Sequence, residues 1–108
     1  MDSNKLNSFI NQVVGDMGAT MHSTLIVLGD KLGLYKAMAG AGPLTSSELA
    51  ERTGTTERYV REWLNANAAG GYVTYDPVTR RFELPPEQAF ALTEMDIPGA
   101  FHIATAGL

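Results

Sequence analysis

The chain has 108 residues, the length of a single domain, and carries a net charge of −4. Hydrophobic residues make up 44% and charged residues 19%, a balance that argues against disorder and against a polyanion as the natural partner. The chain contains no cysteine, which excludes disulfides, thiolate nucleophiles and cysteine metal sites. We read no signal peptide, and apolar runs such as Leu25–Leu28 are too short to cross a bilayer, so we expect a soluble cytoplasmic domain.

Two leading helices are predicted from apolar residues that recur every three or four positions. The first is Leu6–Met17, and glycines at positions 15 and 18 are expected to end it. The second begins near Ala19 and extends to Met38, where Gly40–Pro43 supplies stop signals.

A helix-turn-helix is predicted next. Thr45 and Glu48 have the spacing of a capping box, which opens a short helix to about Thr53. Gly54 makes a tight turn, and a second helix follows over about 56–69. Two helices joined by a short turn that contains glycine are typical of this motif.

A β-hairpin is predicted directly after the helix-turn-helix. Residues 72–76 and 81–84 are rich in β-formers and flank a turn at Asp76-Pro77, and a short helix follows over about 87–92. The fold class is therefore mainly α with a small β-hairpin: a winged helix-turn-helix preceded by two helices. We divide the chain into a leading segment (1–27) expected to form a dimer, a winged-helix domain (28–92) and a terminal segment (93–108).

The winged-helix segment resembles the N-terminal domain of bacterial S-adenosylmethionine-dependent methyltransferases, of the kind often labelled methyltransferase or transcriptional regulator. The resemblance rests on a combination of short runs, GPLT at 42–45, ELA at 48–50, RYVREWL at 58–64 and AGGYV at 69–73, with PGAF at 98–101 resembling the lead into the catalytic domain. It implies a module for dimerisation and for capping the substrate pocket of a small-molecule methyltransferase. It also implies that S-adenosylmethionine belongs to a separate catalytic domain of the full-length parent, that this chain holds no cofactor, and that residues 93–108 lead toward that domain.

Residues that could carry chemistry are few. Gly40-Ala41-Gly42 is a G-x-G sequence, but it follows a helix and precedes proline, so we interpret it as a helix stop. His22 and His102 are far apart in sequence, and their spacing predicts no metal site. We expect His22 to be a packed or surface residue near a helix start. We identify no catalytic residue, and we name only Phe101 and His102 as candidates for substrate contact in a full-length parent.

An exposed apolar face is the stronger functional signal. A compact winged helix needs about one leading helix to complete its core, so one apolar stripe is left over and predicts a homodimer. The alternative is that both leading helices wrap their own core. The candidate interface residues are Phe9, Ile10, Val13, Val14, Met17, Met21 and Leu25.

Two alternatives to the methyltransferase module stay open. In one, a dimeric winged-helix regulator reads DNA through Arg58, Arg61, Arg80 and Arg81. The local charge over 45–70 is −1, however, and the arginines on the second helix are spaced to pair with glutamates, which argues against DNA. In the other, the dimer is a standalone module that encloses a small apolar ligand.

Overall fold

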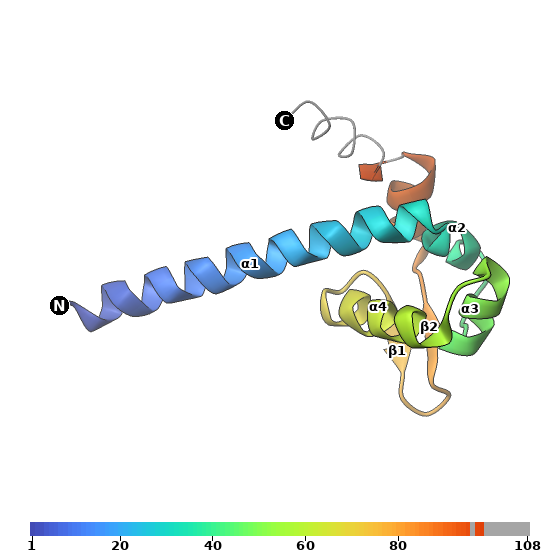
Figure 1. Ribbon diagram of the computed structural model, residues 1–108, viewed down its shortest axis with the longest axis horizontal. Coiled ribbons are helices and arrows are strands. Elements are labelled where there is room, and N and C mark those ends of the chain that lie inside the picture. Colours follow the sequence, from blue (N-terminus) through green and yellow to red (C-terminus); the bar gives the residue numbers. More distant parts are fainter. Residues whose placement is uncertain (96, 99–108) are drawn as a thin grey trace.

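The computed structural model describes residues 1–95, 97 and 98, and it consists of a long helix that projects from a compact body (Figure 1). The body holds the helix-turn-helix, the wing and two short closing elements, all packed around the end of the long helix. In chain order the elements are α1 (Ser3–Lys31), α2 (Leu34–Met38), α3 (Ser46–Thr53), α4 (Glu57–Ala69), β1 (Thr74–Asp76), β2 (Arg81–Glu83), α5 (Pro86–Ala89) and a π-helical turn, η1 (Phe90–Glu94).

Two helices precede the helix-turn-helix, as predicted, but the break between them was placed wrongly. The chain stays helical through Gly15 and Gly18, and α1 ends only at Lys31, before Gly33 adopts a left-handed φ of 71°. One glycine in a helix costs roughly 1 kcal/mol relative to alanine, which weakens a helix without ending it. A left-handed residue does end it, because it turns the chain out of the helical path.

The predicted helix-turn-helix and wing are confirmed. Thr45 accepts the backbone N–H of Glu48 and the Glu48 carboxylate accepts the backbone N–H of Thr45, which completes the capping box. Gly54, with φ 64°, ends α3 before α4 begins. Strands β1 and β2 pair antiparallel with Tyr75 opposite Phe82, and Leu44 adds an isolated bridge to Phe82.

The core lies between α2, α3, α4, the wing and the closing helix. On α4, Val60 and Leu64 are at most 1% exposed, and Trp63 lies beside them at 3%. The indole N–H of Trp63 donates to the Leu25 carbonyl at 2.9 Å, which fastens α1 to α4. The buried hydrophobic residues are Leu34, Tyr35, Met38, Leu44, Leu49, Ala50, Val60, Trp63, Leu64, Val73, Phe82, Leu84, Ala89 and Leu92.

One polar side chain, Asn67, is fully buried in this core. Its amide oxygen accepts the Tyr35 hydroxyl at 2.7 Å, and its amide nitrogen donates to the Trp63 carbonyl at 2.9 Å. Burial raises the pKa of the Tyr35 hydroxyl, with a smaller upward contribution from Tyr72, and the hydrogen bond to Asn67 partly opposes this. Buried polar groups that are hydrogen-bonded in this way hold neighbouring elements in one arrangement.

The short helix predicted over about 87–92 is found in a different form. α5 begins at Pro86, and the chain then widens into a π-helical turn in which the Met95 N–H donates to the Phe90 carbonyl at 3.0 Å. Within the described part of the chain, none of the helices is both long and apolar enough to span a membrane.

Candidate functional site

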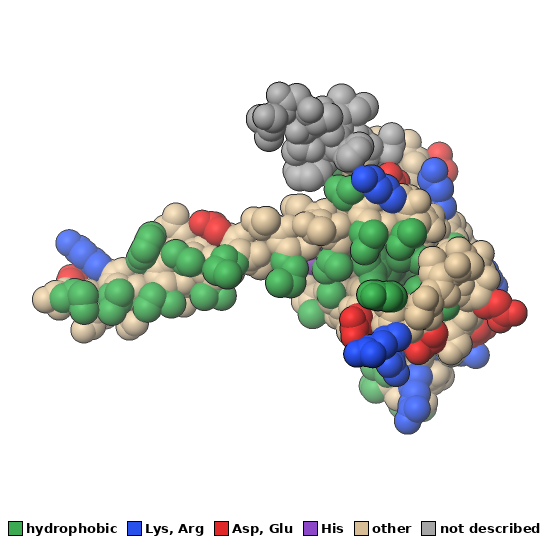
Figure 2. Space-filling view, viewed as in Figure 1, with side chains coloured by type: hydrophobic (Ala, Val, Ile, Leu, Met, Phe, Trp, Pro, Cys, Tyr) green, Lys and Arg blue, Asp and Glu red, His purple; other side chains and the backbone are tan. Residues whose placement is uncertain are grey.

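The N-terminal part of α1 makes the most unusual surface of the molecule. We call residues 3–21 the arm, because every one of them is exposed while the helix continues unbroken into the body. Figure 2 shows hydrophobic side chains following one another along the arm. Six of the seven predicted interface residues lie on it and are 39–68% exposed, namely Phe9, Ile10, Val13, Val14, Met17 and Met21.

Leu25, the seventh predicted interface residue, lies where α1 meets the body. It is half-buried and packs against the core cluster. The sequence pattern placed Leu25 in one group with the arm residues because their helical spacing is continuous. The structure separates Leu25 from them, since α4 reaches α1 only in this second half of the helix.

An apolar face of this kind is costly to leave in water. Helical stability in proteins comes mostly from packing of such a face, and helices on their own are marginal in water. Burial of one Val, Leu, Ile, Phe or Met side chain contributes roughly 1.5–3 kcal/mol. The arm carries Leu6 in addition to the six predicted residues, so a partner that covered it would gain a large stabilisation.

A cavity of about 170 Å³ lies at the root of α1, where the apolar face reaches the body. It is bordered by Leu28 of α1 and by Leu32, the residue that caps the end of α1; they are 44% and 45% exposed. Trp63 and Tyr59 border it on α4, and Tyr59 is 74% exposed. The full lining is Leu25, Leu28, Leu32, Leu34, Thr55, Tyr59, Val60, Glu62 and Trp63.

The sequence analysis missed this cavity, although a signal was present. Leu28 and Leu32 continue the spacing of the arm, four residues apart, but a periodic pattern cannot tell a side chain that faces its own core from one that faces a partner. Trp63 belongs both to the buried core and to the lining of the cavity.

His22 lies within the second half of α1 and not near a helix start as expected. It is half-buried, and its ring centroid lies 4.2 Å from that of Tyr72. Its Nε2 atom is buried and has no hydrogen-bond partner among the described residues. Across residues 1–95, 97 and 98, no three His, Cys, Asp or Glu side chains group as a metal site would require. Phe101 and His102, the candidates for substrate contact, lie outside the described residues.

Three of the four arginines that a DNA reader would use, Arg58, Arg61 and Arg81, lie beside carboxylates within the protein. On α4, Arg58 lies 3.7 Å from Glu62 and Arg61 lies 3.9 Å from Glu57, which are the i,i+4 pairs expected from the sequence. Such exposed pairs contribute little to stability, but each places a carboxylate beside the cation.

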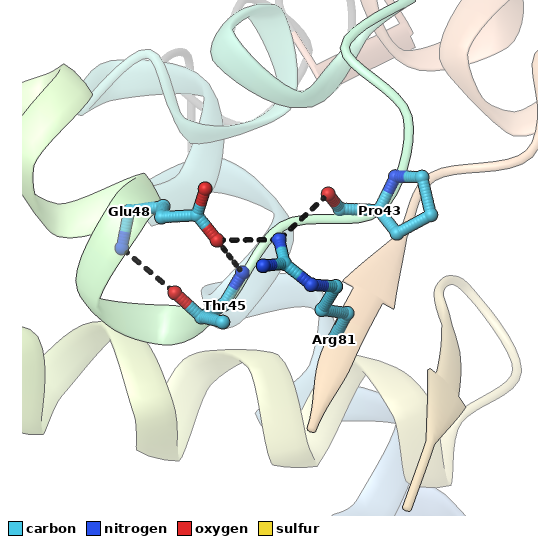
Figure 3. A network of polar contacts seen from close by, with 4 residues as sticks. All are labelled: Pro43, Thr45, Glu48 and Arg81. Atoms are coloured by element: carbon cyan, nitrogen blue, oxygen red, sulfur yellow. Dashed lines mark hydrogen bonds and ion pairs between the residues drawn. The ribbon is translucent and has the colours of Figure 1, made fainter. Parts of the chain in front are cut away.

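In the wing, Arg81 lies 2.6 Å from the Glu48 carboxylate and donates to the Pro43 carbonyl at 3.5 Å (Figure 3). Hydrogen bonds from Thr45 to the carboxylate, with the Arg81 charge adding to them, lower the pKa of Glu48. Arg80 is exposed at the tip of the wing with a left-handed φ of 57°. The structure therefore ties Arg81 to the capping box of α3 and does not collect the four arginines into one free basic patch.

Comparison with solved structures gives the same winged-helix fold within larger enzymes. The mitomycin 7-O-methyltransferase MmcR matches 81% of this chain at 23% identity with a TM-score of 0.68, and a structure of PigF with SAH matches 69% at 19% identity with a TM-score of 0.61. A pericyclic reaction enzyme matches 85% at 18% identity with a TM-score of 0.64. The chain spans 21–27% of the length of these three proteins. No curated protein matches the chain.

A family model matches residues 20–94, which include the whole body and the second half of α1. The matched range contains the capping box, α4 and the wing, which are the features that the sequence patterns had predicted. The chain belongs to the family of Rv2258c-like winged helix-turn-helix domains.

Proposed function

We propose that this chain is the N-terminal dimerisation and substrate-cap domain of an S-adenosylmethionine-dependent methyltransferase that acts on small molecules. The single observation that carries the proposal is the arm, nineteen helical residues with one apolar face, all of them exposed in the part of the chain that the structure describes. An exposed apolar face of this length typically marks a protein–protein interface. A second copy of the same chain supplies a complementary apolar face, since a two-fold dimer uses the same patch on both subunits.

The role as a module of a larger enzyme rests on the solved structures. Each of those three proteins is about three times as long as this chain, and one is an O-methyltransferase while another was solved with SAH. The methyl donor then binds in a separate part of the parent, and the winged helix closes over the acceptor. A pericyclic reaction enzyme has the same fold, and a fold does not determine the chemistry, so the donor has to be tested directly.

DNA reading is the weaker candidate because of the charges on the expected reading surface. The helix α4 begins with two arginines and two glutamates arranged as pairs, and Arg81 of the wing is held by Glu48. Duplex binding gains most of its affinity from cations that neutralise phosphates. A surface whose cations already have carboxylate neighbours gains less.

Sedimentation equilibrium of the purified chain at micromolar concentration tests the dimer. We expect a mass of twice 11.6 kDa, and a mass of 11.6 kDa at every concentration would overturn the dimerisation role. Calorimetric titration with S-adenosylmethionine tests whether the donor binds in a separate domain, because this chain alone is then expected to bind none. Stoichiometric binding would contradict the cap role, and a salt-dependent mobility shift with duplex DNA would favour the regulator.

A further inference from the structure

The apolar face of α1 does not stop at the end of the arm. It begins at Leu6 and continues through Met21 to Leu28 and Leu32, which border the cavity and are almost half exposed. Figure 2 shows the hydrophobic row of the arm leading onto a hydrophobic area of the body. Any partner that covers the whole face must therefore cover the cavity as well.

Antiparallel pairing of two copies covers this face completely. The face extends from Leu6 to Leu32, so its midpoint is near residue 19, and a two-fold axis there sets each Leu6 opposite the partner's Leu32. The same register sets Ile10 opposite the partner's Leu28. Parallel pairing would instead set each residue opposite its own copy, so that no residue of the partner's arm would lie against the cavity.

The helical repeat supports the same register. Ile10 and Leu28 are eighteen residues apart, which is five full turns at 3.6 residues per turn, so their side chains leave α1 in the same direction. In a two-fold antiparallel pair, two residues with the same direction meet across the interface. Phe9 is rotated by about 100° from that direction.

We propose that the partner's arm fills the cavity at the root of α1, with the partner's Ile10 placed against Leu28 and between Tyr59 and Trp63. This inference rests on the proposed dimerisation and specifies its register and its contact site. The cavity, at about 170 Å³, has room for one side chain of this size, since a cavity of roughly 150 Å³ holds a benzene molecule. Its lining is almost entirely apolar, which suits an isoleucine from the arm.

Disulfide trapping tests the register, because the chain has no cysteine of its own. In the double variant Ile10→Cys/Leu28→Cys, the two positions of one chain are about 27 Å apart along the helix, and a disulfide requires Cα atoms within about 7 Å. A bond between them must therefore join two chains. We expect mild oxidation to give a covalent dimer at least tenfold faster than in the matched control Phe9→Cys/Leu28→Cys.

A dimer by mass that gives no faster cross-linking at 10/28 than at 9/28 overturns this register and leaves dimerisation standing. A protein that is monomeric at all concentrations overturns both proposals.

Discussion

The arm and the body contain similar apolar side chains with opposite surroundings. Val60 and Leu64 on α4 are at most 1% exposed, whereas Val14 and Phe9 on α1 are 63% and 61% exposed. Both helices have the spacing of an amphipathic helix, so the pattern alone does not distinguish them. The difference lies in what packs against each face: α4 is covered by α3, the end of α1 and Tyr35 of α2, whereas none of the described residues buries the arm.

A charge in the middle of the arm should have the largest effect, and it should weaken dimerisation without unfolding the body. Val13→Glu occurs twice in a two-fold dimer, and each copy removes an apolar contact worth roughly 1.5–3 kcal/mol. We therefore expect the dissociation constant to rise by more than about 100-fold, since each 1.4 kcal/mol is a factor of ten. Sedimentation equilibrium measures the change.

The matched control is the neighbouring Gln12→Glu, which adds the same charge about 100° around the helix and away from the apolar face. Its dissociation constant should stay within a few fold of the original. Equal weakening by the two variants would mean that net charge, and not the apolar face, governs association.

Shortening a buried side chain of the body should lower the stability of the fold without weakening dimerisation. Leu64 is fully buried, and a buried Leu→Ala change costs about 2–5 kcal/mol through lost contacts and a residual cavity. We expect thermal melting to fall equally at low and high protein concentration. Met17→Ala, which removes apolar contact from the arm, should instead make the melting temperature depend less on concentration. The reverse pattern would show that the arm belongs to the folding core.

The body could be predicted from the sequence because its signals are local. A capping box at Thr45, a left-handed glycine at position 54 and alternating residues before Asp76 each determine the conformation of a few neighbouring residues. The end of α1 could not be predicted this way, since Gly15 and Gly18 each weaken the helix by only about 1 kcal/mol and the rest of the sequence outweighs them.

The candidate site was only half predictable for a different reason. The arm residues were identified from their spacing, but Leu28 and Leu32 share that spacing and were grouped with the rest of their helix. Whether such residues face a core depends on where α4 meets α1, and that contact joins residues 38 positions apart, Trp63 and Leu25. The π-helical turn at Phe90–Glu94 has no recognisable sequence signal.

The same substitution at two glycines of α1 should have opposite effects. A Cβ at Gly29 would meet the ring of Trp63 and approach Tyr35 to 2.8 Å, so Gly29→Ala should push α1 away from α4 and cost about 1–3 kcal/mol. A Cβ at Gly15 meets nothing within 4 Å, so Gly15→Ala should stabilise the helix by about 1 kcal/mol. Thermal melting monitored by circular dichroism compares the two directly.

Two further variants serve as controls for the substitutions at Gly15 and Gly29. Gly18→Ala also meets open space and should repeat the stabilisation of Gly15→Ala. Trp63→Phe combined with Gly29→Ala should recover part of the loss, because the smaller ring leaves room for the added methyl group. A Gly29→Ala protein as stable as the original would show that α1 and α4 do not meet as closely as the structure places them.

The smallest expected effect concerns the capping box, which joins α3 to the wing. Thr45→Ala removes the side-chain acceptor of the Glu48 N–H and should cost about 1 kcal/mol at neutral pH. The pKa of Glu48 is lowered by its hydrogen bonds with Thr45 and by Arg81, so its carboxylate stabilises the fold above pH 4.5, the usual pKa of the group. This contribution is lost as the pH falls below 4.5 through the lowered pKa, because the folded carboxylate must then take up a proton.

Glu48→Gln should therefore lower the melting temperature at pH 7 and flatten its fall below pH 4.5. Glu62→Gln is the matched control, because the ion pair of Glu62 with Arg58 is exposed on both sides and contributes little. If both variants keep the original pH dependence, the network of Figure 3 does not link the wing to α3 in solution. If only Glu48→Gln changes it, this carboxylate stabilises the body through its hydrogen bonds with Thr45 and its ion pair with Arg81.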